Sequence, residues 1–388
     1  MIVLRSSLLP SKAILFFLWL FLLVFPKGGF KIGAIPITWG YVLLGIVSLF
    51  SLFRNRYMFH NLRFSAFLFT IPFQIISIIS FIIHGVADNS LLISFLVSLL
   101  FLPWIFYLFL SEYIDSMNLC LFLRLVKTGV LFVSSYGIAL FIIKLITGKL
   151  IEIPFLTVNY HDYGEVENKC NNRGSVFKLI STYNNGNIYG ICILMLLPLY
   201  QFLESSRWKK TTVFLSLILS FSRTVWAGLI FSEIIASILL KKKNIILKLL
   251  TTLAISLIAI LSITFYFGFD FSFLFDVTMG GRVDQLESFS AMHLFPIQSF
   301  SGINEIVYFG ILSNFGIVGL LSFVAALTGP ILFSFSYPSF SPIRQAILCG
   351  LINYLFLSLS DGALLLIPVL VFYWFLSALI LRQDLYPK

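Results

Sequence analysis

Three arginines occur in settings suited to binding an anion. Arg223 interrupts a long apolar stretch, Arg173 lies in an asparagine-rich segment, and Arg282 follows a pair of glycines. A guanidinium carries a planar fork of N–H donors that matches a phosphate group. A charge inside an apolar stretch usually faces a polar cavity or a partner, because lipid does not solvate it. The three arginines are therefore candidate ligands of a phosphate-containing substrate. Each also has a structural interpretation: Arg223 can snorkel to headgroups, Arg173 can lie in a solvated loop, and Arg282 can pair with a nearby loop carboxylate.

Other polar residues near these arginines suit sugar binding and proton transfer. Asn185 and Asn187 offer both donors and acceptors of the kind that bind sugar hydroxyls, and Asn187 also suits the N-cap of a following helix. Glu305 immediately precedes an apolar run. It could act as a general base at a membrane surface, or it could compensate a helix dipole. Glu233, within an apolar run, is a candidate proton relay or substrate contact.

The sequence contains no pattern that predicts a metal or a cofactor. Its four cysteines and isolated histidines lack the spacing of metal ligands, and only Cys170 falls in a long loop, so no disulfide framework is expected.

The composition shows what kind of scaffold must position these residues. Hydrophobic residues make up 59% of the 388 residues and charged residues only 11%, against about 25% in soluble domains. Lipid must therefore solvate much of the surface. The net charge of +10 comes largely from lysines and arginines in short gaps between apolar runs, a pattern that sets membrane orientation and does not indicate nucleic-acid binding.

Segments of about 20 apolar residues predict about twelve membrane spans. The sequence predicts an all-α, polytopic membrane helix bundle, a single transmembrane domain over residues 1–388, with an uncleaved first span. The seventh and eighth segments share one stretch, which Ser222, Arg223 and Thr224 break in the middle. The predicted segments are 13–26, 32–53, 64–84, 91–110, 124–146, 187–203, 211–222, 224–240, 249–268, 306–333, 345–359 and 363–381.

Basic residues settle the expected orientation. If both termini are cytoplasmic and every segment crosses once, most of the lysines and arginines lie inside. They are those in 54–63, 124–127, 207–210 and 241–248, together with Arg5, Lys12, Arg344, Arg382 and Lys388. That asymmetry holds only if the stretch 211–240 crosses twice; a single tilted helix is the alternative. Two long loops, 147–186 and 269–305, then face outward, and loops of such length are usually functional or disordered.

Three segments of the chain resemble a known family. Arg173–Gly190 (RGSVFKLISTYNNGNIYG) resembles the arginine- and asparagine-containing entry to a span in O-antigen polymerases and ligases. Ser220–Trp226 (SFSRTVW) resembles their Ser-Arg span break. Gly280–Arg282, followed by Ser301–Leu321 (SGINEIVYFGILSNFGIVGLL), resembles the pattern after their second large loop. Together these segments cover about an eighth of the chain. The resemblance implies a GT-C-like bundle with two large periplasmic loops.

The resemblance implies a function and roles for the candidate residues. It implies a metal-independent glycosyltransferase of the bacterial inner membrane that polymerises O-antigen repeat units linked to undecaprenyl pyrophosphate. Arg282 and Glu305 would be catalytic. The substrate would be bound by Arg173, Arg223, Asn185, Asn187 and Tyr308. Besides this substrate and membrane lipid, a chain-length regulator is the expected partner.

Two other functions stay open at this point. Ligases of the superfamily carry a histidine where this chain has Glu305, which favours the polymerase over a ligase that transfers polysaccharide to lipid A core. A flippase or another transporter is the non-enzymatic alternative. Transporters commonly show internal repeats and polar residues near the bilayer midplane. No repeat is visible here, and the polar residues concentrate in the two outward loops.

Overall fold

The computed structural model describes residues 11–32, 35–54, 61–151, 153–158, 164, 166, 171–173, 176–239, 254, 258, 262, 282–283, 292–303, 305–337 and 341–385. Most of the predicted span 249–268 lies outside these residues. So do most of residues 159–170 of the predicted loop 147–186 and most of residues 269–291 of the predicted loop 269–305.

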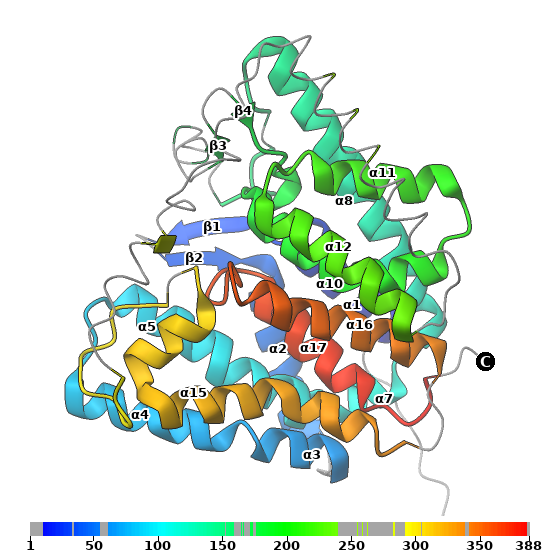
Figure 1. Cartoon of the computed structure of the whole chain (residues 1–388). Coiled ribbons are helices and arrows are strands. Elements are labelled where there is room, and N and C mark those ends of the chain that lie inside the picture. Colours follow the sequence, from blue (N-terminus) through cyan, green and yellow to red (C-terminus); the bar gives the residue numbers. More distant parts are fainter. Residues whose placement is uncertain are drawn as a thin grey trace, which may run out of the picture.

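The chain is mostly helical (Figure 1). In chain order the described helices are α1 (Ser11–Trp19), η1 (Leu20–Val24), α2 (Trp39–Arg54), α3 (Asn61–Leu68), α4 (Ile71–His84), α5 (Asn89–Phe95), η2 (Leu96–Phe101), α6 (Leu102–Trp104), η3 (Ile105–Phe109), α7 (Ser111–Ser116), α8 (Leu119–Thr147), η4 (Ser181–Tyr183), α10 (Gly186–Leu203), α11 (Arg207–Ile218), α12 (Arg223–Leu239), α15 (Val307–Ser334), α16 (Pro342–Leu357) and α17 (Val369–Ile380).

Several helical stretches are long and apolar enough to cross a membrane. Among the described residues these are Leu62–His84, Asn89–Phe109, Leu119–Thr147, Gly186–Leu203 and Val307–Ser334. Because a span needs about 20 apolar residues, these stretches identify a helical membrane protein. Each segment predicted from the sequence that lies within the described residues contains a helix.

Two small hairpins depart from the predicted all-α fold. Strands β1 (Gly29–Ile32) and β2 (Ile35–Thr38) pair antiparallel, so the helix expected from residue 32 begins only at Trp39. Pro36 favours extended backbone before it, and the β-branched residues Ile35, Ile37 and Thr38 suit a strand. The second hairpin pairs β3 (Asn172–Arg173) with β4 (Val176–Phe177). A hydropathy pattern detects apolar runs but does not separate such a short hairpin from a helix end.

The apolar stretch from residue 211 to 240 forms two helices, as the sequence indicated. α11 ends at Ile218, α12 begins at Arg223, and Phe221 between them adopts a left-handed conformation with φ of 44°. The start of α11 lies beside the end of α10, where the hydroxyl of Tyr200 donates to the carbonyl of Lys209. The start of α12 lies near the start of α10, as the contact between Val225 and Gly190 shows. α11 and α12 therefore run in opposite directions.

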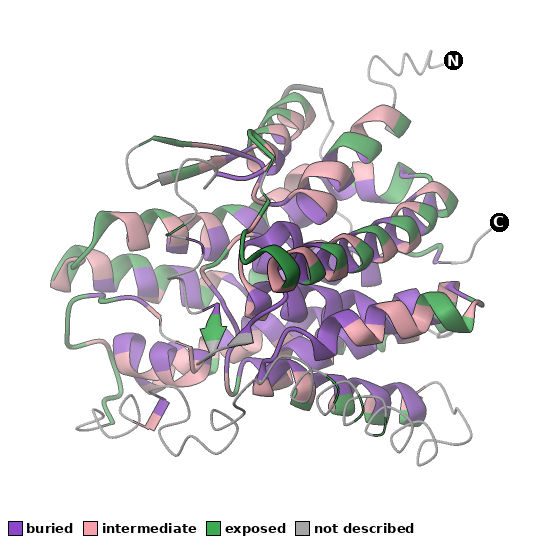
Figure 2. Cartoon of the chain, turned by 90° about the horizontal axis from the view of Figure 1, so that it is seen from above, coloured by how far each residue is buried: buried purple, intermediate pink, exposed green. Residues whose placement is uncertain are grey.

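Helix α10 occupies the centre of the bundle. Over Gly186–Leu203, 83% of its residues are buried. It packs against α8, α12, α16 and α17. The buried residues are drawn purple in Figure 2. Close approach to α16 depends on Gly350, where an added Cβ would lie 2.0 Å from the carbonyl oxygen of Met195. The tight packing fixes the start of α10 relative to the end of α16.

Candidate functional site

Arg282 lies between two carboxylates. Its Nη2 atom is 2.7 Å from Oε2 of Glu305 and 3.5 Å from Oδ2 of Asp361. The arginine and the aspartate are buried, with exposed fractions of 8% and 4%, whereas 41% of the Glu305 side chain is exposed. Charged groups are rarely buried unless paired, so this group of three is a built electrostatic site.

An asparagine and a lysine complete the charged cluster. Nδ2 of Asn187 donates to Oδ2 of Asp361, and Oδ1 of the same amide accepts a hydrogen bond from Nζ of Lys178 at 3.3 Å. Lys178 is fully buried. The charged cluster therefore consists of Arg282, Lys178, Glu305, Asp361 and the bridging amide of Asn187.

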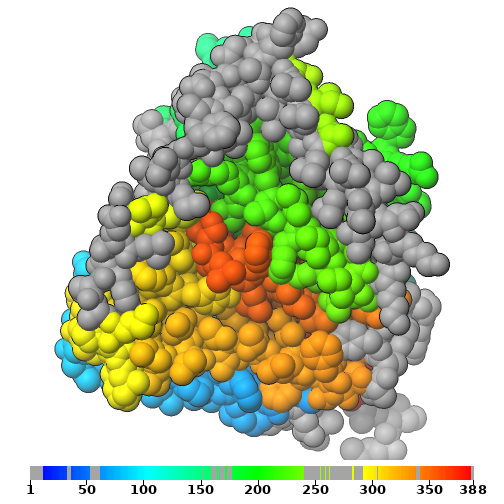
Figure 3. Space-filling view, viewed as in Figure 1, coloured from blue at the N-terminus to red at the C-terminus, as the bar shows by residue number. Residues whose placement is uncertain are grey.

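The connection between α16 and α17 carries Asp361 and is fastened on two sides. The backbone N–H of Gly362 donates to the carbonyl of Glu305 at 3.2 Å, and the N–H of Val307 donates to the carbonyl of Ser358 at 3.2 Å. The hydroxyl of Tyr354 donates to the carbonyl of Gly362. This connection, orange-red in Figure 3, reaches the surface between α12 in green and the segment before α15 in yellow. Backbone hydrogen bonds thus join the two segments that carry Glu305 and Asp361.

The segment before α10 enters the bundle and supplies Lys178. Residues 177–184 are all buried, although the sequence placed them in a polar outward loop. The N–H of Leu179 donates to the carbonyl of Leu219, and the hydroxyl of Tyr183 donates to the carbonyl of Leu23. Asn185 is the N-cap of α10, since its Oδ1 accepts from the backbone N–H groups of Asn187 and Ile188 at 2.8 and 3.1 Å. This cap aims Asn187, the second residue of the helix, at Asp361.

Burial raises the pKa of Asp361 from 3.8 to about 6. Removal of water disfavours the charged carboxylate most strongly, and the nearby carboxylate of Glu305 acts in the same direction. Arg282, the hydrogen bond from Asn187 and the charge of Lys178 oppose these effects. Asp361 therefore exchanges its proton near neutral pH, in the range useful for a proton-coupled step.

The remaining predicted substrate-binding residues lie at different places. Arg223 is the half-buried first residue of α12, and its neighbour Thr224 shares a hydrogen bond of 3.1 Å with Ser360, next to Asp361. Tyr308 donates its hydroxyl to the carbonyl of Leu355 at 3.0 Å, which ties the start of α15 to α16. Arg173 pairs with Val176 in the β3–β4 hairpin, and its side chain lies outside what the structure describes. Arg223 and Arg282 thus occur at the same end of the bundle, near the connection that carries Asp361.

Two residues of the charged cluster were not singled out from the sequence. Lys178 lies inside the segment that resembles the polymerases and ligases, but its burial depends on a fold that the sequence does not reveal. Asp361 did carry a signal: it is the one acidic residue between positions 342 and 381, in a short gap between two apolar runs. An acidic residue so close to membrane depth is a functional candidate by default.

Glu233 lies outside the charged cluster. It is buried on α12 and accepts a hydrogen bond from the side-chain amide of Gln201 on α10. The contact lies closer to the other ends of these helices, so it does not join Glu233 to Asp361 or Arg282.

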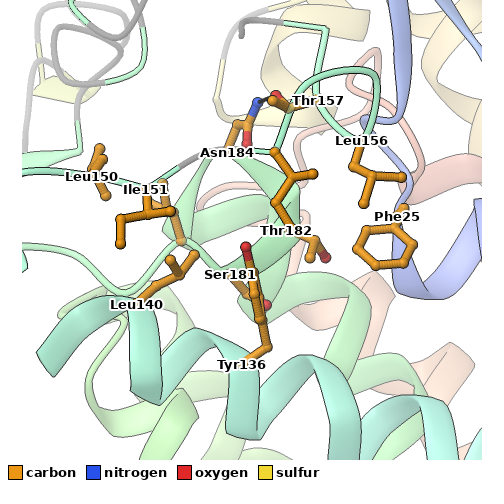
Figure 4. Close-up of a pocket in the computed structure, with 12 residues that line it drawn as sticks. Phe25, Tyr136, Leu140, Leu150, Ile151, Leu156, Thr157, Ser181, Thr182 and Asn184 are labelled. Carbon is orange, nitrogen blue, oxygen red and sulfur yellow. Dashed lines mark hydrogen bonds between the residues drawn. The ribbon is translucent and has the colours of Figure 1, made fainter. Parts of the chain in front are cut away.

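A separate cavity lies on the other side of the buried segment before α10 (Figure 4). Asn184 lines it and donates a hydrogen bond to Thr157. Most of its other walls are apolar, from the end of η1, α8 and the loop after α8, and none of the charged cluster lines it. The lining residues are Phe25, Tyr136, Leu140, Leu150, Ile151, Ile153, Leu156, Thr157, Ile180, Ser181, Thr182 and Asn184.

The chain was also compared with known proteins. No family model, curated protein or solved structure matches it.

Proposed function

We propose that the chain polymerises O-antigen repeat units linked to undecaprenyl pyrophosphate, at the periplasmic face of the bacterial inner membrane. The observation that carries the proposal is the position of Arg282 between Glu305 and Asp361, beside Lys178 and Asn187, at one end of an apolar helical bundle. Such a site combines cations for a diphosphate, amide groups for sugars and carboxylates for an acceptor hydroxyl.

The reaction requires little covalent chemistry from the protein. The acceptor hydroxyl attacks the anomeric carbon of the donor glycan, the bond from that carbon to the diphosphate oxygen breaks, and the lipid diphosphate leaves with the electron pair. Arg282 and Arg223 stabilise the charge that develops on the leaving group, since preorganised cations in a low-dielectric site do this better than water. Glu305, which is partly exposed, orients the acceptor hydroxyl and receives its proton.

The distribution of basic residues supports the proposed orientation. Among the described residues, a second set of ion pairs lies at the helix ends opposite the charged cluster: Lys127 and Lys209 approach Glu204 at the end of α10, at 3.3 and 3.9 Å. Arg63, fully buried, pairs with Asp115 at 2.7 Å. Basic residues concentrate on the cytoplasmic side of membrane proteins. We therefore propose about twelve spans in a GT-C-like bundle, with the charged cluster and both large loops in the periplasm.

Reporter fusions test this orientation. Fusions at Tyr163 and Glu287, in the two large loops, are expected to report the periplasm. A cytoplasmic signal at Glu287 would contradict the proposed orientation of the second loop and with it the periplasmic site.

The lipopolysaccharide ladder of a deletion strain tests the function. Loss of a polymerase leaves core with a single repeat unit. Loss of a ligase leaves bare core while lipid-linked polymer accumulates, and loss of a flippase leaves bare core without polymer. Complementation with the intact chain is expected to restore the long ladder, whereas bare core in the deletion strain would refute the proposal.

A further inference from the structure

The cations of the charged cluster are already engaged by carboxylates of the same chain. Arg282 contacts Glu305 and Asp361, and Lys178 reaches Asp361 through the amide of Asn187. With every group ionised, two positive charges face two negative charges. A diphosphate that binds to these cations therefore meets two carboxylates competing for the same donors and repelling its own charge.

We propose that Asp361 is an internal competitor of the substrate diphosphate, so that binding of a diphosphate-linked glycan at Arg282 is accompanied by uptake of a proton on Asp361. The inference rests on the proposed function in one respect, namely that the diphosphate is bound at Arg282. It adds a coupling between substrate binding and protonation that the proposed reaction does not itself require.

The two carboxylates differ in how their negative charge can be removed from the site when a diphosphate binds. Glu305 has 41% of its side chain exposed and precedes a helix, so it can turn toward solvent and remain charged. Asp361 is 4% exposed and lies in a connection fastened to Glu305 and Tyr354. Turning its carboxylate into water would break those contacts, so protonation is the less costly way to remove its charge.

The surroundings of Asp361 favour the neutral acid at moderately low pH. Glu305 faces it from the segment before α15, Asn187 from α10 and Lys178 from the segment before α10. Arg282 faces it from the chain between α12 and α15. Tyr354 of α16 also lies close, and its hydroxyl donates to Gly362. Burial and Glu305 together place the pKa of Asp361 at about 6, so a bound diphosphate, as a further negative charge, would raise that pKa again.

Calorimetry on the full-length chain in lipid nanodiscs tests the coupling. The probe is a farnesyl diphosphate linked to N-acetylglucosamine, whose doubly substituted diphosphate does not titrate between pH 5 and pH 8. We expect its Kd to fall by up to about tenfold per pH unit as the pH decreases from 7.5 toward 6. Titrations at pH 7 in buffers of different ionisation enthalpy should also show net proton uptake, and this readout needs no variant.

Three substitutions assign the proton. Asp361→Asn should bind the probe with an affinity that does not change between pH 5.5 and 7.5. Glu305→Gln should keep the pH dependence but move its midpoint to lower pH, because Glu305 helps to raise the pKa of Asp361. His293→Gln, a control for the exposed histidine in the segment before α15, should leave the pH dependence unchanged.

The outcomes separate this inference from the proposed function. Binding that is independent of pH and takes up no proton would overturn the coupling while leaving the diphosphate site intact. A pH dependence that survives in Asp361→Asn would also overturn it. No binding at any pH would refute the diphosphate site and the coupling together.

Discussion

Asn187 and Asp361, 174 residues apart in the sequence, are joined by a hydrogen bond between the side-chain amide and the carboxylate. The bond connects the second residue of α10 to the link between α16 and α17. Because the same amide accepts from Lys178, Asn187 contacts two of the four ionisable groups of the charged cluster. The position of one neutral side chain therefore has consequences for two ionised groups.

Asn187→Ala removes both contacts at once. We expect a shorter O-antigen ladder and a raised KM for the lipid-linked substrate, with normal protein level, because Lys178 and Asp361 lose the amide that spaces them. Asn118→Ala is the matched control: Asn118 caps α8, and its loss should cost about 1 kcal/mol of stability without shortening the ladder. If Asn187→Ala and Asn118→Ala gave ladders of the same length, Asn187 would have no role in the site.

Glu305→Gln preserves the shape of the side chain but removes its charge and its ion pair with Arg282. If Glu305 orients the acceptor hydroxyl, the variant should insert and fold yet produce only core with a single repeat unit. If the carboxylate merely compensated the dipole of α15, the change would cost about 0.3–1 kcal/mol of stability and the ladder would stay normal. Lipopolysaccharide gels at matched protein level decide between these outcomes.

Arg223→Lys keeps the charge and loses the planar fork of donors. We expect a clear reduction of long polymer, because an ammonium is a point charge that does not replace bidentate binding of a phosphate. Arg207→Lys, at the start of α11 and the opposite end of the bundle, serves as the control and should give a normal ladder. A normal ladder from Arg223→Lys would show that Arg223 does not act by bidentate phosphate binding.

Gly350→Ala tests the packing that positions the charged cluster. An added Cβ would lie 2.0 Å from the carbonyl oxygen of Met195, so α16 and α10 must separate, at a cost of about 1–3 kcal/mol or more. We expect a lower unfolding temperature in detergent and a shorter ladder. Gly45→Ala on α2 meets no atom within 4 Å and should be neutral or stabilising by up to about 1 kcal/mol, which makes it the matched control.

The raised pKa of Asp361 also predicts how stability depends on pH. Between pH 4 and pH 6 the folded chain retains a proton that the unfolded chain has released, so the free energy of unfolding should decrease as the pH rises through this window. A shift from 3.8 to about 6 corresponds to about 3 kcal/mol at most. Chemical unfolding at several pH values should show the decrease in the intact chain and a smaller one in Asp361→Asn.

The sequence predicted the helices better than the site. Apolar runs located the helical segments, and the polar break at Ser222 correctly divided the stretch that holds α11 and α12. The hairpin at Gly29–Thr38 was missed because its apolar strands have the hydropathy of a helix end. Glu305 and Arg282 were named from the sequence, but their pairing with each other and with Asp361 depends on chain segments that meet only in three dimensions.

The enclosure of α10 has a consequence for the order in which the protein is assembled. α10 is surrounded by protein rather than lipid over most of its length, and two of its neighbours, α16 and α17, follow it by more than 130 residues in the chain and are translated after it. α10 is therefore synthesised before those neighbours exist. A chain truncated after α15 would retain its earlier apolar helices but lack Asp361, so the site is completed only after the connection between α16 and α17 has been synthesised.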